Sequence, residues 1–516
     1  MNIQNTNLTC RSQNDPQPQF TDMIAQNETT LVHTFRIRHL DAQDLVALQS
    51  QNHAPSALFQ KRDRSLKNPS YTILALDAAL TVSITNNSVE IEGSTRQVKQ
   101  MQLPGCPFEF LNALHAAQTS AIEYNALPAD IAFASGMIGY LGFGLTSQIE
   151  KIEKQESNPL SVPDSRMMLP QTIVYIDHQN ASAHVISRAG AERFHSIVQK
   201  LESRNNNSSQ ANRRSQAPTQ HAPSSATNTA NLTASMSKQD FLDKAIQAKR
   251  LIEEGQCFQI VLSQRFSAPI STSAAEMFST LLATAPSTYN YFLNFPDFQY
   301  IGASPETMVS TKAGQVRLCA LAGTRPRGTT QTQDDNNEIE LRTNEKELAE
   351  HLMLVDLGRN DLGKVCVPGS IKVGPIAQVL KYSNVMHLGT EIFGVLESNN
   401  NPFKALKACF PRGTVSGAPK VRALELLSKL EPEQRGIYAG AVGFFDGRGN
   451  MDTAIAIRSA LIKDNFIHIN AGAGIVYDSV PEFEYMETIN KASAIASVFQ
   501  QVQLEDELHI VRAGAN

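Results

Sequence analysis

Residues Tyr438 to Val476 read YAGAVGFFDGRGNMDTAIAIRSALIKDNFIHINAGAGIV. Three apolar stretches, GAVGFF, TAIAIRSALI and FIHINAGAGIV, are separated by the turn sequences DGRGN and KDN. Short apolar runs bounded by Gly, Asn and Asp are typical of strands joined by tight turns. The segment therefore predicts an antiparallel meander.

The same pattern occurs before this segment. Alternating apolar residues flank Asn86-Asn87 between residues 80 and 91, which predicts a hairpin. Helices are expected after Ser237, a candidate N-cap, and over Glu338 to Leu357. Strand runs mixed with separate helices predict an α+β fold with large antiparallel sheets and helices packed outside, not a doubly wound α/β sheet.

The composition excludes several functional classes. The chain has 516 residues, 41% of them hydrophobic and 18% charged, which is enough for two or more sub-domains. Its net charge of −5 gives no reason to expect nucleic acid. Six scattered cysteines without a C-x-x-C pair suggest neither zinc nor a disulfide framework. With no signal sequence and no membrane-length apolar run, a soluble, cytoplasmic protein is expected.

Low-complexity sequence divides the chain. Residues 1–20 are predicted to be a disordered tail, and 21–201 an N-terminal domain. Residues 202–235 are rich in Asn, Ser, Gln, Ala and Thr, so they cannot bury enough apolar surface to order themselves. This stretch is interpreted as a linker or surface loop. Residues 236–512 then form the C-terminal domain.

Two pairs of glutamates carry the first chemical signal. Glu347 and Glu350 are three residues apart, as are Glu484 and Glu487. Residues at this spacing share a helix face, so each pair can direct two carboxylates into one pocket. Mg²⁺ is commonly held by one or two carboxylates together with substrate oxygens and water. Solvent-facing helices also carry glutamates at this spacing, so the pattern alone leaves both interpretations open.

Glycine-rich turns and cations provide the second signal. Residues 323–328 (GTRPRG) and 471–474 (AGAG) place glycines where backbone N–H groups can bind a carboxylate, although a purely structural role is an alternative. His387 lies in an apolar setting, where a histidine is often only a core residue. The candidate cations for an anionic ligand are Arg325, Arg327, Lys420, Arg422, Arg458 and Lys491.

Taken together, seven segments resemble the chorismate-binding enzyme family, and within it the anthranilate synthase component I group. They occur in family order and are GASPE (302–306), LAGTRPRG (321–328), ELAEHLMLVDLGRNDLG (347–363), VMHL (385–388), GTVSGAPKVRALELL (413–427), YAGAVGFFDGRGNMDTAIAIRSA (438–460) and AGAGIVYDSVPEFEYMETINKA (471–492). The resemblance implies the component I fold, with residues 236–512 as the chorismate-binding catalytic domain.

Two positions distinguish the members of this family. Aminodeoxychorismate synthases typically carry a nucleophilic lysine where this chain has Ala322. Hydroxylating isochorismate enzymes carry a lysine base where it has Gln259, and a neutral amide cannot activate water. The resemblance therefore implies a lyase of tryptophan biosynthesis that converts chorismate and ammonia to anthranilate and pyruvate. The alternatives are an aminodeoxychorismate synthase component I of the folate branch, a hydroxylating isochorismate-type enzyme and an inactive binding protein.

The resemblance also implies roles for individual residues. Mg²⁺ would be held by Glu350 and Glu487, supported by Glu347 and Glu484. Glu306 would protonate the leaving hydroxyl and His387 would promote pyruvate loss, with Thr414 and Lys491 completing the catalytic set. The residues implied to bind chorismate are Gly323, Thr324, Tyr438, Arg458, Gly472, Ala473 and Gly474.

A partner and a regulator follow from the same resemblance. The chain has no G-x-C-x-G segment of a glutamine amidotransferase, so ammonia is expected from a separate amidotransferase subunit (component II) in a hetero-oligomer. The tryptophan-site motifs are degraded. PSALFQKRDRS (55–65) does not match the usual LLES, and Thr288, Tyr289 and Asn290 stand where NPSPYMF is usual. Weak or absent inhibition by tryptophan is expected.

Overall fold

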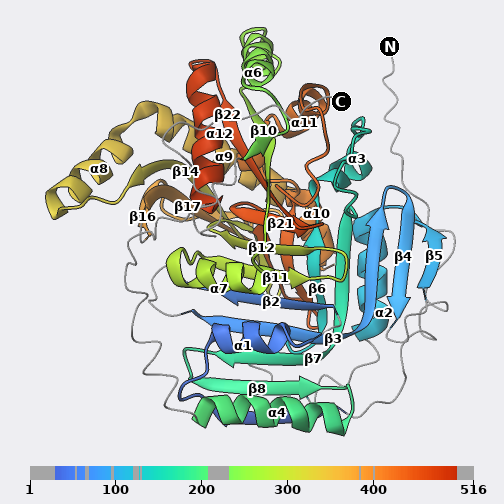
Figure 1. The fold of residues 1–516 in the computed structure, drawn as a ribbon. Coiled ribbons are helices and arrows are strands. Elements are labelled where there is room, and N and C mark those ends of the chain that lie inside the picture. Colours follow the sequence, from blue (N-terminus) through green and yellow to red (C-terminus); the bar gives the residue numbers. More distant parts are fainter. Residues whose placement is uncertain are drawn as a thin grey trace.

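The computed structural model describes residues 30–52, 55–63, 69–93, 98–119, 127, 131–206, 232–382, 385–398 and 401–496. Within these ranges the strands form one connected antiparallel network of 22 strands, with helices around it (Figure 1). The predicted α+β class is confirmed. The predicted tail, residues 1–20, lies outside the described residues, as does most of the predicted linker.

Two long strands, β3 (Tyr71–Thr85) and β7 (Ser165–Asp177), organise the network. They pair along their whole length but bend near Asp77, where φ is 55° and the register shifts between Ala78 and Leu80. A bulge of this kind bends a strand and increases its twist. The two halves of each strand therefore belong to two different sheets.

Sheet one contains the half of β3 from Tyr71 to Leu76 and the half of β7 from Thr172 to Asp177, and it runs from the bottom of Figure 1 to its top. Its order is β1 (Leu31–Arg36), β8 (Ser182–Ser187), β7, β3, β2 (Ser56–Lys61), β11 (Tyr289–Asn294), β12 (Gln299–Ser304), β21 (Ser459–Lys463), β22 (Phe466–Ile475) and β10 (Gln259–Pro269), with β9 (Thr233–Ala234) and β18 (Gly417–Ala418) on β10.

Sheet two contains the other half of the long strands. Its order is β5 (Val98–Gln102), β4 (Ser88–Gly93), β3, β7, β6 (Gly136–Leu141), β19 (Ala441–Asp446), β20 (Met451–Ile455), β13 (Thr307–Lys312), β14 (Gln315–Pro326) and β17 (Val385–Val395), with β15 (Lys372–Val373) and β16 (Gln378–Lys381) on β17.

The two sheets face each other across an aromatic core. Phe59 of β2 packs edge-on against Phe444 of β19 at 5.8 Å, and Tyr291 and Tyr140 are fully buried nearby. Large aromatic rings in such contacts contribute about 1 kcal/mol beyond the area that they bury. Since strands from both halves of the sequence supply this core, the N-terminal and C-terminal parts form one packed body.

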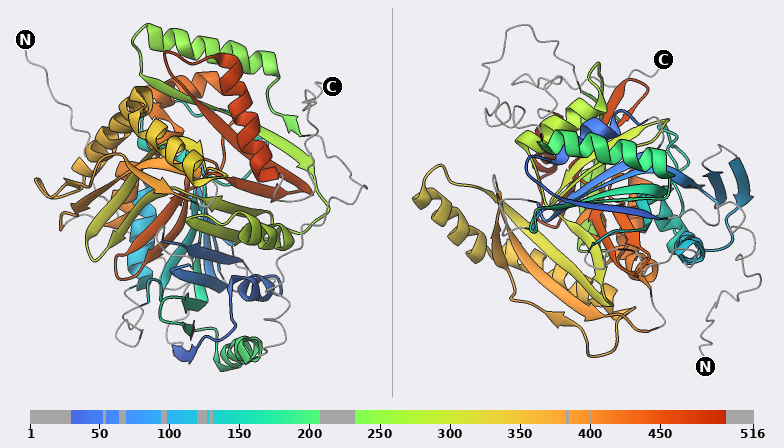
Figure 2. Two further views of the ribbon diagram at one scale, coloured as in Figure 1. Left: turned by 90° about the vertical axis from the view of Figure 1, so that its left-hand side faces the viewer. Right: turned by 90° about the horizontal axis from the view of Figure 1, so that it is seen from below.

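Helices cover the outer face of each sheet (Figures 1 and 2). Those packed on sheet one are α1 (Ala42–Gln49), α4 (Ala191–Asn206), α6 (Lys238–Glu253), α7 (Ala274–Thr284), α11 (Lys420–Leu430) and α12 (Pro481–Ala496). Those packed on sheet two are α2 (Pro107–Thr119), α9 (Glu345–Gly363) and α10 (Pro402–Cys409). The short helices η4 (Phe143–Leu145), α3 (Thr146–Ile149) and η5 (Gly413–Val415) lie in connections, and α8 (Gln331–Thr343) projects from the body. No described helix is long and apolar enough to cross a membrane.

Several local predictions are confirmed. The hairpin pairs Ile84 with Val89, and α6 begins with a reciprocal capping box between Ser237 and Asp240. The helix predicted over residues 338–357 is wrong as a single element. Asn344 has an extended backbone, and its side chain accepts a hydrogen bond from the Glu347 N–H, so α8 ends and α9 starts there.

The predicted meander is correct at its turns but not in its middle. TAIAIRSALI forms two strands, because β20 pairs with strands of sheet two whereas β21 pairs with strands of sheet one. The chain changes sheets at Arg458, which has a φ of 52°. No propensity rule predicts this, because the kink is imposed by two sheets that the rest of the chain builds.

The predicted linker begins later than expected. Helix α4 continues to Asn206, because Phe194, Ile197 and Leu201 form one buried stripe on it. Asn205 accepts hydrogen bonds from the backbone N–H groups of Arg38 and His39. At the other end Leu232 is buried and β9 pairs with β10. Residues 207–231 lie outside the described residues.

Candidate active site

A cavity of about 560 Å³ lies where β10, β22, β14 and β17 meet the helices α9 and α12. It collects side chains that are up to about two hundred residues apart in the sequence. Of the residues implied to act on chorismate or Mg²⁺, those that line the cavity are Glu306, Gly323, Thr324, Glu347, Glu350, His387, Thr414, Tyr438, Arg458, Gly472, Gly474, Glu484, Glu487 and Lys491.

The four glutamates reach the cavity from two helices. Glu347 and Glu350 lie on α9, and Glu484 and Glu487 lie on α12. The pKa of Glu350 is raised by burial and further by the charges of Glu347 and Glu487. Burial and the charge of Glu487 likewise raise the pKa of Glu484. The carboxylates therefore disfavour one another's ionised form, as expected for groups that await a cation.

Nearby donors offset this repulsion only in part. Gln259 donates from Nε2 to Glu350 Oε1 at 2.9 Å, Arg325 pairs with Glu347 at 3.0 Å, and Lys491 pairs with Glu487 at 2.5 Å. No group of three or more Asp, Glu, His or Cys side chains among the described residues is arranged to hold a metal by itself. The donor set fits Mg²⁺, which keeps several water or substrate oxygens in its shell.

A bulge in β14 shapes the opposite wall. The pairing with β17 shifts between Ala322 and Arg325, so Gly323 and Thr324 both lie opposite His387. Gly323 has a φ of +60°, and a Cβ there would come within 2.9 Å of Glu347 Oε2. Glycine is therefore favoured at this position both by the positive φ and by the close approach of the Glu347 carboxylate.

The bulge also fixes the imidazole of His387. The nitrogen Nδ1 lies 2.8 Å from the carbonyl oxygen of Gly323, and Thr324 Oγ1 lies 3.0 Å away. Because a carbonyl only accepts hydrogen bonds, Nδ1 carries the proton and Nε2 is the basic nitrogen. His387 is thus an oriented cavity residue rather than a core histidine.

Glu306 lies at the start of β13 and is only 6% exposed. The hydroxyl of Thr414, on η5, donates to Glu306 Oε1 at 2.9 Å. The backbone carbonyl of Glu306 accepts a hydrogen bond from the Ile455 N–H. These contacts hold the Glu306 carboxyl group at the cavity wall, with Thr414 orienting it.

Arg458 and Tyr438 provide the cationic side. The positive φ of Arg458 turns its side chain into the cavity, and burial lowers its pKa while the charges of Tyr438 and Glu487 raise it. The guanidinium makes no hydrogen bond or ion pair with any residue in the described ranges. Burial raises the pKa of Tyr438 to about 12, so its hydroxyl remains a donor. Arg458 is half-buried, and its position in the cavity wall leaves the guanidinium available to an anionic ligand.

Strand β22 contributes backbone rather than side chains. Gly472 and Gly474 line the cavity, and a Cβ on Gly474 would meet Gln259 Nε2 at 2.9 Å. Lys491 donates to the carbonyl of Gly472 at 2.8 Å. Ala473 is fully buried and does not line the cavity, because successive residues of a strand face opposite sides. A side-chain role for Ala473 in binding is therefore not supported.

The other candidate cations are engaged elsewhere. Arg325 pairs with Glu340 as well as Glu347, and Arg327 pairs with Asp334. Lys420 forms a buried pair with Asp361 at 2.7 Å, and Arg422 pairs with Glu425. None of these four cations lines the cavity. They hold α8, α9 and α11 in place.

Sequence reasoning missed three polar residues of the cavity wall, Asn344, Lys346 and Asn470. Asn470 lies on β22 at the same parity as Gly472 and Gly474, so strand alternation identifies it once those glycines are assigned. Lys346 stands among charged residues at a helix start, and nothing in its surroundings distinguishes it from a solvated lysine.

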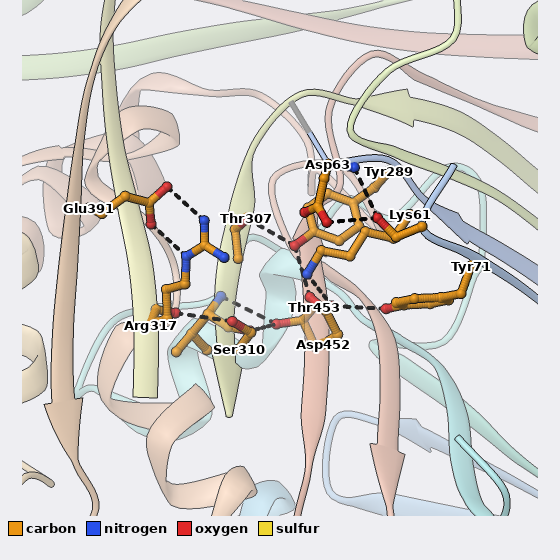
Figure 3. Close-up of polar contacts among 12 residues, drawn as sticks. Lys61, Asp63, Tyr71, Tyr289, Thr307, Ser310, Arg317, Glu391, Asp452 and Thr453 are labelled. Carbon is orange, nitrogen blue, oxygen red and sulfur yellow. Dashed lines mark hydrogen bonds and ion pairs between the residues drawn. The ribbon is translucent and has the colours of Figure 1, made fainter. Parts of the chain in front are cut away.

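None of the candidate inhibitor residues lines this cavity, and Figure 3 shows one of them, Tyr289, among its polar contacts. Strands β11 and β2 pair, with Tyr289 opposite Lys61 and Asn290 opposite Gln60, so the two degraded motifs are adjacent. Tyr289 donates to Asp452 Oδ1 at 2.8 Å, and Asn290 donates to Gln60 at 3.2 Å. Thr288 and Tyr289 help to line a separate cavity of about 190 Å³. Residues 64 and 65 of the first motif lie outside the described residues.

Comparison with known proteins agrees with this site. The family model described as chorismate binding enzyme matches residues 69–497. The chain belongs to the chorismate-binding enzyme family.

Within that family, it is similar to anthranilate synthase component 1 of Lactococcus lactis, with 38% identity over 432 residues covering 83% of this chain and 91% of that protein. The crystal structure of anthranilate synthase component I from Streptococcus pneumoniae superimposes with a TM-score of 0.68 at 34% identity, covering 84% and 93% of the two chains. The menaquinone-specific isochorismate synthase of Escherichia coli shares the fold, with a TM-score of 0.64 at 20% identity and coverage of 92% and 96%.

Proposed function

We propose that this chain is the chorismate-converting component of an anthranilate synthase in tryptophan biosynthesis. The observation that carries the proposal is the position of Gln259, which faces the cavity and hydrogen-bonds Glu350. Hydroxylating members of the family need a base at this position, and an amide cannot act as one. Ala322, which also lines the cavity, offers no nucleophile for the aminodeoxychorismate reaction.

Chorismate carries two carboxylates, and the cavity has two regions that suit them. Arg458 and the backbone of β22 at Gly472 and Gly474 bind one carboxylate through charge and close approach. The second faces Glu350 and Glu487, with Glu347 and Glu484 beside them. Mg²⁺ bound there would neutralise the substrate charge and orient the ring.

Amination requires a leaving hydroxyl to be protonated. Ammonia adds at ring carbon 2 while the C–O bond to the ring hydroxyl breaks, and the hydroxyl leaves as water after taking a proton from Glu306. The Thr414 hydrogen bond holds the Glu306 carboxyl in place for this transfer. The proton shed by the new amine balances the one that Glu306 gives up.

Aromatisation requires a base on the other side of the ring. The His387 imidazole has Nδ1 tied to the Gly323 carbonyl, so Nε2 removes the proton from carbon 2. The bond from the ring to the enolpyruvyl oxygen breaks as the ring becomes aromatic. The enolpyruvate that leaves takes up one proton at its CH2 carbon to become pyruvate, which balances the proton removed from carbon 2. Because the tautomer is set before substrate binds, no reorganisation of His387 is needed during the step.

The ammonia source is a partner subunit in this proposal. The related proteins are named component 1, which implies a second component in their assemblies. We infer that a glutamine amidotransferase supplies ammonia to the cavity in a hetero-oligomer. We place the protein in the cytoplasm, because the five cysteines within the described ranges are all free thiols.

A product assay tests the function. The purified chain is incubated with chorismate, Mg²⁺ and excess ammonium at mildly alkaline pH, and we expect fluorescent anthranilate and pyruvate in equal amounts. A non-aromatic amino product that yields p-aminobenzoate only after a lyase is added would assign the chain to the folate branch instead. Loss of product on chelation, restored by Mg²⁺, tests the metal.

A further inference from the structure

A buried ion pair lies directly behind the cavity. Arg435 and Glu431, in the connection between α11 and β19, are 5% and 6% exposed and line no part of the main cavity. Arg435 donates from Nε to Glu431 Oε2 at 2.8 Å and from Nη2 to Glu431 Oε1 at 2.6 Å. The fork-to-fork geometry fixes both side chains relative to each other.

The remaining donors of Arg435 hold two backbone segments of the active site. Nη1 donates to the Val415 carbonyl and Nη2 to the Val261 carbonyl, both at 2.6 Å. Val415 directly follows Thr414, whose hydroxyl orients Glu306. Val261 lies two residues after Gln259, whose amide binds Glu350. One guanidinium thus joins the segment that positions the acid to the segment that positions the metal-side carboxylate.

Glu431 extends the connection to the substrate-binding strand. Its Oε1 accepts hydrogen bonds from the N–H of Ser263 at 2.8 Å and from the Ser263 hydroxyl at 2.9 Å. Ser263 of β10 lies opposite Gly472 of β22 in the antiparallel register. The pair therefore contacts three of the segments that form the cavity, at Val415, Val261 and Ser263.

Residues from the N-terminal part of the chain also pack against this ion pair. The ring of Phe143 lies 4.4 Å from the guanidinium carbon of Arg435, and Tyr438 lies on another side at 5.9 Å. Gln155 donates to the backbone carbonyl of Glu431 at 2.7 Å. These contacts exclude water, which strengthens the hydrogen bonds of the pair.

Stability alone does not account for such a pair. Two charges lose much hydration energy on burial, and well-packed apolar residues of similar size are often equally or more stabilising. We propose that Arg435 and Glu431 are positioning residues that hold Glu306 and Glu350 in register across the cavity. The inference rests on the proposed function in one respect, because it takes Glu306 as the general acid and Glu350 as a ligand of Mg²⁺.

A matched pair elsewhere on the same elements provides the control. Arg265 of β10 and Glu433 form a bidentate pair with two contacts of 2.8 Å, and they join the same strand to the same connection. This pair makes no contact with Thr414, Gln259 or Ser263. Arg435→Lys keeps a charge but loses the fork, and Arg265→Lys makes the same change without touching the active site.

The experiment measures kcat, the Kd of chorismate and the thermal midpoint for both variants in the full chain with Mg²⁺ and ammonium. We expect Arg435→Lys to lower kcat by about 100-fold, since misplacement of a reacting group by about 1 Å has effects of this size. Its Kd should change by less than about threefold, because Arg458 and β22 are untouched. Arg265→Lys should lose comparable stability with kcat within about twofold of the parent.

A second variant tests whether the ion pair acts by positioning active-site residues or only by packing in the core. In Arg435→Met/Glu431→Leu the buried charges are gone, but the carbonyls of Val261 and Val415 and the N–H of Ser263 lose these partners, so some stability is lost and kcat is measured well below the thermal midpoint. Continued loss of kcat in this well-folded variant would support positioning. Recovery of kcat with stability, or equal losses of kcat in the Arg435 and Arg265 variants, would overturn it. The readout is chorismate consumption, so a parent enzyme that made another product would refute the proposed function without deciding this test.

Discussion

The active-site cavity and the Lys61 cluster (Lys61, Tyr71, Tyr289 and Asp452) are both charged regions, but they differ in how their charges are matched. In the cavity, Arg458 has no ion-pair partner among the described residues, and burial together with the charge of Glu487 raises the pKa values of Glu350 and Glu484. In the Lys61 cluster, Asp452 forms an ion pair with Lys61 and accepts hydrogen bonds from Tyr71 at 2.9 Å and Tyr289 at 2.8 Å (Figure 3).

The cavity therefore has the properties of a ligand-binding site, whereas the charges of the Lys61 cluster are paired with one another. Burial lowers the pKa of Lys61, but the charge of Asp452, the charge of Tyr289 and the hydrogen bond to Asp452 together more than offset this, and the net pKa is raised. For Arg458 the charges of Tyr438 and Glu487 raise the pKa by less than burial lowers it, so its net pKa is lowered. A half-buried charge without an ion-pair partner among the described residues, in the wall of a cavity, points to the binding of an anionic ligand.

The strongest test of this comparison is a substitution of Glu350. Glu350→Gln keeps the shape and can still accept the hydrogen bond from Gln259, but it removes the negative charge. We expect turnover to fall by at least about 100-fold, because the charge acts directly on the bound metal and substrate. Steady-state anthranilate fluorescence measures it. Glu345→Gln, at an exposed position of the same helix, is the control and should retain full activity.

Retained turnover in Glu350→Gln, with a folded protein, would contradict the assignment of the glutamate pairs. It would show that the charge of Glu350 is not needed for turnover, and that any metal is held by other residues.

Arg458 should show opposite effects on activity and stability. In Arg458→Gln the anionic ligand loses a charge-assisted hydrogen bond, which corresponds to a rise in KM of about 10- to 100-fold. The thermal midpoint of the ligand-free protein should stay the same or rise, because a half-buried cation without an ion-pair partner among the described residues is removed. Steady-state kinetics and differential scanning calorimetry measure the two effects. A variant that loses stability and keeps its KM would show that Arg458 is structural.

The sequence identified most of this cavity before its geometry was known. The family and the α+β fold were predicted from motifs and strand patterns and are confirmed. The two glutamate pairs, His387 and Arg458 were singled out by spacing or by their apolar neighbours, and the structure brings them together. Their chemical roles stay predictions.

What the sequence did not show depends on distant parts of the chain. The break at Asn344 depends on the cap that it offers to α9, and the kink at Arg458 depends on two sheets that meet there. Arg435 stands in a polar stretch, EPEQRG, that is typical of a solvated connection. Its burial results from Phe143, almost three hundred residues earlier, and no local pattern signals such a contact.

The Lys61 cluster should respond in stability alone. Lys61→Met leaves Asp452 as a buried carboxylate without its cation, which should cost about 3 kcal/mol of unfolding free energy. In Lys61→Met/Asp452→Asn the amide oxygen accepts from one tyrosine and the amide NH2 donates to the hydroxyl oxygen of the other, so most of the loss should be recovered. Denaturant titration measures this, with kcat near the parent value in both variants. A large fall in kcat at full stability would show that the cluster communicates with the active site.

The smallest expected effect is that of tryptophan. The cavity beside the Lys61 cluster is about 190 Å³ and is lined by Lys61, Arg62, Asp63 and Arg317, with Thr288 and Tyr289 on one wall. An indole gains binding energy from apolar walls, whereas here it would displace water from charged groups without replacing their hydrogen bonds. We therefore predict no measurable heat of tryptophan binding and no inhibition at millimolar tryptophan. Binding in the micromolar range by calorimetry would show that the Lys61 cluster opens to form a regulatory site, and that its charges do not satisfy one another completely.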